Sequence, residues 1–134
     1  MICRISKDFV DEEFFCNDLY RTPVPSKYQF NLVDLVSQLQ IMRDRIGLPF
    51  RISSGYRTAL HNQIVGGEKN SQHLYCKAAD IETPIGIRLV DFQDSFDEAM
   101  NGGIIINGGL GRYTWGLHYD IGPGPRRWDR RNKG

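Results

Sequence analysis

The sequence is poor in cysteine and has no long apolar run. Its three cysteines, Cys3, Cys16 and Cys76, are an odd and sparse set, which excludes a disulfide framework and favours a reducing compartment. No apolar stretch approaches the roughly 20 residues that cross a bilayer. The first residues show no apolar segment after a basic start, so we expect no signal peptide and synthesis in the cytoplasm.

An excess of charge of one sign is also missing. The 17 basic and 16 acidic side chains give a net charge of +1, which argues against nucleic acid or an anionic membrane as a partner. The 134 residues suit one domain, 1–134, with its own core. We expect residues 1–25 to form a helix and a loop, and residues 126–134 a basic tail that is solvated or holds an anionic polymer. The oligomeric state stays open.

The apolar pattern predicts helices first, then strands mixed with helices. Apolar residues recur every three or four positions in 26–46, which predicts a helix with Ser26 and Gly47 as caps. Other helices are expected at 11–19, at 58–65 with Thr58 as cap, and at 86–101. Strands are expected at 49–54, 78–83, 103–107 and within 109–122, where a hairpin turn also falls. This order predicts an α+β fold with a small, mostly antiparallel sheet and flanking helices.

Histidine is scarce, with only His61, His73 and His118 in the chain. A catalytic zinc ion commonly takes three His and carboxylate ligands from separate elements and keeps one position open. His73, Asp80 and His118 would make such a set. The seven residues from His73 to Asp80 would span about 23 Å as a straight strand, so the chain must turn back and His73 must lie on a loop. Strand alternation puts Asp120 on the same face as His118.

Several neighbouring residues have competing interpretations. Cys76 forms a His-x-x-Cys pair with His73, and as a fourth ligand it would close the site and favour a structural zinc ion. We interpret His61 as a structural residue. Four aromatic residues line a groove or belong to the core: Tyr56, Tyr113, Trp115 and Tyr119. The glycines of "NGGIIINGGLGR" do not match a phosphate-binding loop.

Four segments in combination resemble one family. They are "SGYRT" at 54–58, "HNQIVGGEKNSQH" at 61–73, "KAAD" at 77–80, and "GLGRYTWGLHYDIG" followed by "RRW" at 109–128. Together they are similar to the zinc D-Ala-D-Ala carboxypeptidases and L-Ala-D-Glu endopeptidases of the hedgehog/DD-peptidase fold. The resemblance implies that His73, Asp80 and His118 bind Zn²⁺. It also implies that Arg57 binds a substrate carboxylate or stabilises the oxyanion, and that Ser71 orients the substrate.

The general base is where the chain departs from part of this family. Many members carry an acidic residue three positions before the strand histidine, and here that residue is Trp115. Others carry an aspartate two positions after it, which matches Asp120. We therefore expect Asp120 to act as the general base or to orient a metal ligand. Glu82 and Glu68 are weaker candidates for the base.

The resemblance implies a zinc metallopeptidase that cleaves peptidoglycan stem peptides at a bond involving a D-amino acid. The usual setting of such compact domains points to a phage endolysin, which reaches the cell wall after release by lysis or by injection with a virion. The acid missing at Trp115 motivates an alternative. In that alternative the protein is a non-catalytic binding or virion structural module that keeps the fold and its zinc ion.

Overall fold

The computed structural model describes residues 2–132, which contain three α-helices and one five-stranded sheet. The helices are α1 (Gln29–Ile46), α2 (Ala59–Ile64) and α3 (Leu89–Asn101). The strands are β1 (Ile52–Ser54), β2 (Ala78–Glu82), β3 (Gly109–Arg112), β4 (Gly116–Asp120) and β5 (Arg126–Asp129). Short 3-10 helices occur at η1 (Asp11–Phe14), η2 (Ser26–Tyr28) and η3 (Gln72–Tyr75).

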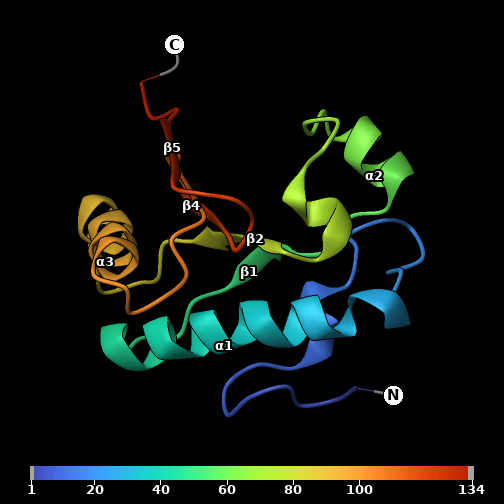
Figure 1. Ribbon diagram of the computed structural model, residues 1–134, viewed down its shortest axis with the longest axis horizontal. Helices are drawn as coiled ribbons and strands as arrows, with labels where there is room; N and C mark the ends of the chain where they lie inside the picture. Colours follow the sequence, from blue (N-terminus) through green and yellow to red (C-terminus); the bar gives the residue numbers. More distant parts are fainter. Residues whose placement is uncertain (1, 133–134) are drawn as a thin grey trace.

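The sheet has the strand order β1-β2-β4-β3-β5. All neighbouring strands are antiparallel except β3 and β5, which are parallel. The predicted α+β class with a mostly antiparallel sheet is therefore confirmed. Strand β4 is central, pairs with both β2 and β3, and is buried along its whole length. In the view of Figure 1, α1 runs along one side of the sheet, and α3 and α2 lie near its opposite ends.

Helix α1 follows the predicted apolar stripe. Its buried residues are Leu32, Leu35, Val36, Leu39 and Met42. Ile46 is partly buried against the same core, and Gly47 ends the helix with a left-handed φ of 74°, as predicted for a C-cap. Ser26 does not cap α1, because it begins η2 instead and α1 starts at Gln29.

The other predicted helices exist with shifted bounds. The helix expected at 11–19 is reduced to η1. Helix α2 is capped as predicted, since the Thr58 hydroxyl accepts a hydrogen bond from the His61 N–H at 3.1 Å. Helix α3 begins at Leu89. Phe96 and Met100 are buried as expected, but Val90 is 39% exposed.

The prediction of a strand at 103–107 is wrong. Ile104 and Ile105 donate their backbone N–H groups to the Ala99 carbonyl, at 2.9 and 3.3 Å. The segment therefore closes the C-terminal end of α3, where helix carbonyls lack partners, instead of joining the sheet. Ile105 is buried, but Ile104 and Ile106 are each 42% exposed.

The basic tail expected at 126–134 is also wrong for residues 126–129, which form β5. The Arg126 N–H donates to the Gly108 carbonyl at 2.8 Å, and the strand runs parallel to β3. Two of its arginines have acidic partners: Arg126 pairs with Asp120, and Arg127 pairs with Asp97. These contacts anchor the segment against the fold. Residues 133–134 of the predicted tail lie outside the described residues.

Candidate functional site

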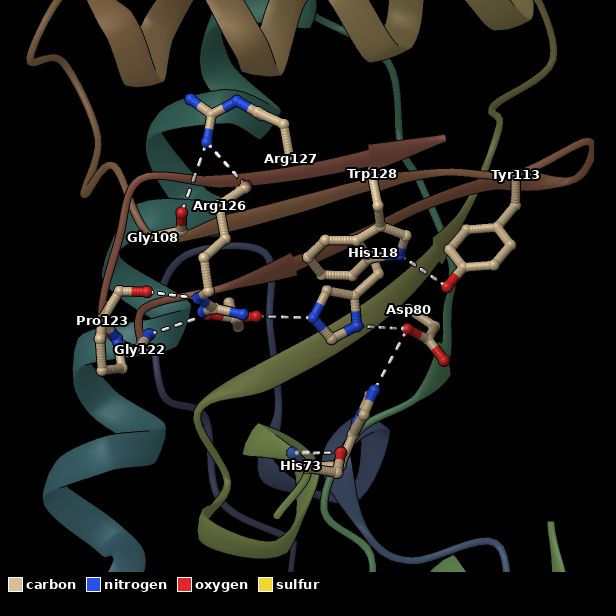
Figure 2. Close-up of polar contacts among 12 residues, drawn as sticks. His73, Asp80, Gly108, Tyr113, His118, Gly122, Pro123, Arg126, Arg127 and Trp128 are labelled. Carbon is tan, nitrogen blue, oxygen red and sulfur yellow. Dashed lines mark hydrogen bonds and ion pairs between the residues drawn. The ribbon is translucent and has the colours of Figure 1, made fainter. Parts of the chain in front are cut away.

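Three side chains predicted as metal ligands, His73, Asp80 and His118, meet at one point. Their candidate ligand atoms all lie within 4.8 Å of one another. His73 comes from η3, Asp80 from β2 and His118 from β4 (Figure 2). Asp80 and His118 are direct partners in the β2–β4 ladder, which brings residues 38 positions apart in the chain to the same place.

The chain turns back between His73 and Asp80, as their spacing predicts. Cys76 ends η3 in the left-handed region, with a φ of 56° that is uncommon for a residue other than glycine. The Lys77 N–H then donates to the Gln72 carbonyl at 3.1 Å. His73 therefore lies off the strand that carries Asp80 and approaches its carboxylate from the side.

Each imidazole has one nitrogen bonded outside the cluster. The Nδ1–H of His73 donates to the Gly55 carbonyl, and the Nε2–H of His118 donates to the Asp120 carboxylate, both at 2.7 Å. Because a carbonyl and a carboxylate can only accept, these contacts set the tautomer of each neutral ring. The remaining nitrogens, His73 Nε2 and His118 Nδ1, then direct lone pairs at Asp80 Oδ1, at 3.2 and 3.0 Å.

Three converging lone pairs repel one another unless a cation lies between them. Two imidazole nitrogens and one carboxylate oxygen are a donor set that zinc and similar divalent ions bind. The outer partners of the rings, a carbonyl and a carboxylate, are also those that typically orient metal-binding histidines. The residues present therefore fit a divalent metal ion.

The charges around the cluster determine which proton a metal ion would have to displace. Burial lowers the pKa of His73, against the raising effect of Asp80. Burial also works against ionisation of His118, but hydrogen bonds to Asp120 and Asp80 outweigh it and raise the pKa of His118. The same contacts, made by His118 and His73, overcome burial and lower the pKa of Asp80. A metal ion would thus compete with a proton that His118 holds between two carboxylates.

Arg57 lies beside the cluster on the wall of a cavity. Its guanidinium donates to Asp80 Oδ2 at 3.1 Å, to Asn62 at 3.2 Å and to Ser54 at 3.2 Å. Three of the five N–H groups of an arginine are thereby used, and the guanidinium is held in place with further donors available. Ser71 lines the same cavity, and its hydroxyl accepts the His73 N–H at 3.2 Å. Its contact with substrate stays a prediction.

Asp120 lies behind His118 and is fully buried. One of its oxygens accepts from His118, and the other accepts from the Gly122 N–H at 2.9 Å and from the Arg126 guanidinium. His118 lies between Asp120 and Asp80, and Asp120 is not among the residues that line the cavity. Of the two roles considered for Asp120, this placement favours the orientation of a metal ligand.

The two weaker candidates for the base lie in different places. Glu82 forms an ion pair with Arg51 at 2.8 Å, and both line a second, separate cavity. Glu68 lies in the exposed loop that follows α2 and lines the cavity beside the metal cluster. Apart from Asp80 it is the one carboxylate residue on that wall among residues 2–132.

Burial and position distinguish between the competing interpretations of the other residues near the site. Cys76 is buried and lies outside the cluster found within the described part of the chain, and burial raises the pKa of its thiol to about 12. Tyr56 and Tyr119 are buried core residues, whereas Tyr113 and Trp115 line the cavity. His61 is half-buried on α2, outside the cluster.

The cavity has a volume of about 740 Å³, and part of its wall was missed by sequence reasoning. Arg126, Trp128 and Arg130, from β5 and the residue after it, line it together with the cluster. The Trp128 ring lies 5.1 Å from the His118 ring, centroid to centroid. The segment "RRW" at 126–128 is part of the family resemblance and could have indicated this wall, but residues 126–134 were expected to form a basic tail. No helix within residues 2–132 is long and apolar enough to span a membrane.

Residues 7–120 match the family model described as Peptidase M15. Comparisons with curated proteins and with solved structures found no match. The matched segment contains all three clustered side chains, and peptidases of this family depend on a metal ion. Because the match spans most of the chain and agrees with the family resemblance of its motifs, this protein belongs to the M15 peptidase family, that of the zinc D-Ala-D-Ala carboxypeptidases.

Proposed function

We propose that this protein is a zinc-dependent peptidase that hydrolyses peptidoglycan stem peptides at a bond involving a D-amino acid. The cleaved bond is D-Ala-D-Ala, as in a carboxypeptidase, or L-Ala-D-Glu, as in an endopeptidase. The observation that carries the proposal is the His73–Asp80–His118 donor set beside a cavity of about 740 Å³. A cavity of this size accommodates a short peptide segment next to the metal.

In this proposal His73, Asp80 and His118 hold the ion. When bound, zinc would supply Lewis-acid polarisation of the scissile carbonyl and a water molecule activated near neutral pH. The Gly55 carbonyl and Asp120 keep the two imidazoles in the tautomers that face the ion. Arg57 offers its remaining N–H groups to a substrate carboxylate or to the developing oxyanion, and Ser71 orients the substrate.

A carboxylate must take the proton of the attacking water and return it to the leaving amine. Asp120 is buried and does not line the cavity, and Glu82 pairs with Arg51 elsewhere. Glu68 lines the cavity and is not bound to the cluster, so we assign the proton transfer to Glu68. This assignment replaces the acidic residue that many family members carry at the position of Trp115.

The test is digestion of purified sacculi by the protein supplied with zinc. New amino termini and shortened stem peptides, identified by mass spectrometry, would support the proposal and identify the bond. His73→Ala and a chelator-treated sample are the controls, and both should release nothing. The absence of new termini with any divalent metal would overturn the proposed activity.

That negative outcome would favour the second candidate function, a non-catalytic binding or virion structural module. The observation behind it is Trp115, which lines the cavity where many relatives carry an acid. A module would retain stoichiometric zinc and bind sacculi without cleaving them.

We also propose that the protein acts on the cell wall of a phage host, after release by lysis or by injection with a virion. The support is the proposed substrate, which lies outside the cytoplasmic membrane, together with the usual setting of compact domains of this kind. Detecting the protein in purified virions or in the lysate of an induced host would test it.

A further inference from the structure

We propose that the Tyr113 hydroxyl donates a hydrogen bond to the carbonyl oxygen of the scissile amide as negative charge develops there. Trp128 acts as the positioning residue for this hydroxyl. The inference rests on the proposed peptidase function and adds a donor that neither the motifs nor the family match assigns.

Tyr113 lies where β3 ends, on the same cavity wall as the metal cluster. Its ring stacks on Trp115 with centroids 4.9 Å apart and an interplanar angle of 17°. Figure 2 shows the hydroxyl pointing back toward the side where His118 and Asp80 lie. Tyr113 therefore shares a cavity with the metal cluster, and its hydroxyl is on the side of the ring that faces the cluster.

The hydroxyl has a proton to offer. Trp128 Nε1–H donates to the Tyr113 oxygen at 2.9 Å, so the oxygen already serves as an acceptor. Within residues 2–132 no protein acceptor takes the Tyr113 O–H proton. A hydroxyl that accepts one hydrogen bond is polarised and donates the next more strongly.

Three hydrogen bonds hold the backbone of the turn that carries Tyr113. The Gln93 side chain, fully buried on α3, donates to the carbonyls of Tyr113 at 2.9 Å and of Gly116 at 2.8 Å. The Tyr113 N–H donates to the Gly116 carbonyl at 3.1 Å. Because the turn is fixed before substrate arrives, little reorganisation is needed when the charge develops.

Trp128 lies between the Tyr113 hydroxyl and His118 of the metal cluster and contacts both. Its indole lies across Gly111, where a Cβ atom would collide with the ring, and it packs 5.1 Å from the His118 ring. The same indole that contacts a candidate ligand on one side donates to Tyr113 on the other. The absence of a side chain at Gly111 is what allows this arrangement.

The oxyanion is the substrate group that suits this donor. A neutral hydroxyl gains most where charge increases during the reaction, whereas Arg57 suits a permanent carboxylate. Arg57 is hydrogen-bonded to Asp80 Oδ2, whereas the Tyr113 hydroxyl is hydrogen-bonded to Trp128. The two donors therefore serve different substrate oxygens.

Tyr113→Phe removes the hydroxyl and keeps the stacked ring. We expect kcat to fall about 100-fold with KM unchanged, which is the effect of losing one oxyanion donor. Zinc content and the melting temperature should match those of the wild type. Tyr20→Phe, at a residue that is 82% exposed, is the matched control and should change nothing. A raised KM with unchanged kcat, or no change at all, would overturn the inference.

Trp128→Phe keeps an aromatic ring but removes the N–H donor. We expect kcat to fall about fivefold, the value of one ordinary hydrogen bond. The double variant should be no slower than Tyr113→Phe alone, because the lost indole N–H acts only through that hydroxyl and the phenylalanine ring still packs beside His118. Losses that multiply fully in the double variant would contradict the positioning role.

Binding of a phosphinate analogue of D-Ala-D-Ala gives a readout without turnover. We expect its Kd, measured by calorimetry on the zinc-loaded protein, to rise about tenfold or more in Tyr113→Phe and to stay unchanged in Tyr20→Phe. If the wild type binds the analogue in this way but cleaves no sacculi, the proposed peptidase function fails and the assignment of Tyr113 as an oxygen-directed donor stands. Equal Kd values in the wild type and Tyr113→Phe overturn the inference whatever the activity.

Discussion

Strand β2 carries two carboxylates two residues apart, and their surroundings differ sharply. Asp80 is 15% exposed at its side chain and contacts His73, His118 and Arg57. Glu82 is 39% exposed and pairs with Arg51, which is itself 76% exposed. Across the ladder on β4, Asp80 faces His118 whereas Glu82 faces Gly116.

The difference shows that strand alternation alone does not make a site. Both residues point to the same face, yet only at Asp80 does the neighbouring strand supply an imidazole and a loop supply a second one. A buried charge must be neutralised by fixed partners, and those partners can hold a metal ion. An exposed pair such as Arg51–Glu82 is solvated and contributes little.

The largest expected effect is that of Asp80→Asn. The amide removes the anionic ligand and leaves the Arg57 charge without its partner. We expect loss of stoichiometric zinc and a fall in peptidase activity of at least about 10³-fold, equivalent to a few kcal/mol of transition-state stabilisation. Metal analysis and muropeptide release are the measurements. The matched control, Glu82→Gln on the same strand face, should keep both, and retention of one zinc per chain in Asp80→Asn would contradict the assigned ligand set.

Asp120→Asn should have a smaller effect, because it changes the residue behind a ligand and not the ligand. We expect zinc affinity to fall about 10- to 100-fold, since the amide no longer holds His118 in its metal-facing tautomer as firmly. A chelator competition titration measures this. Asp129→Asn, which alters an exposed aspartate paired with Arg131, is the control. Equal affinities in the two variants would show that the contact with His118 does not matter.

Zinc affinity should also depend on pH in a defined direction. Although burial opposes it, Asp120 and Asp80 raise the pKa of His118, so a proton competes with the metal below that raised value. We expect about a tenfold loss of affinity per pH unit on the acid side and a plateau on the alkaline side. Competition titrations between about pH 5 and pH 8 would show it. In Asp120→Asn the pKa of His118 is lower, so the loss should begin at a lower pH, and a pH-independent affinity would argue against the histidine ligands.

The smallest effect is expected for Arg51→Ala. Removing the exposed partner of Glu82 should change the free energy of unfolding by less than about 1 kcal/mol. Urea denaturation measures it, and zinc content and activity should not change. A loss of several kcal/mol would mean that the surroundings of Asp80 and Glu82 differ less than their exposure indicates.

Much of the fold was accessible from the pattern of residues. The helix over α1 follows from its apolar spacing and from Gly47, and the turn between His73 and Asp80 follows from their separation. The short segments were harder to predict from the sequence. The isoleucines at 104–106 have strand propensity, but the end of α3 uses their N–H groups, and the basic residues of β5 look solvated until their acidic partners are known.

The sequence by itself determined the identity of the clustered donors, because scarce histidines in a family-like pattern leave few other choices for a metal. It could not decide between the two roles of Asp120 or between groove and core for Tyr113, nor reveal that Trp128 forms part of the cavity wall. Those depend on which nitrogen of His118 faces inward and on where β5 pairs. Both are set by contacts between residues remote in the chain, which local propensity does not encode and only the packed sheet fixes.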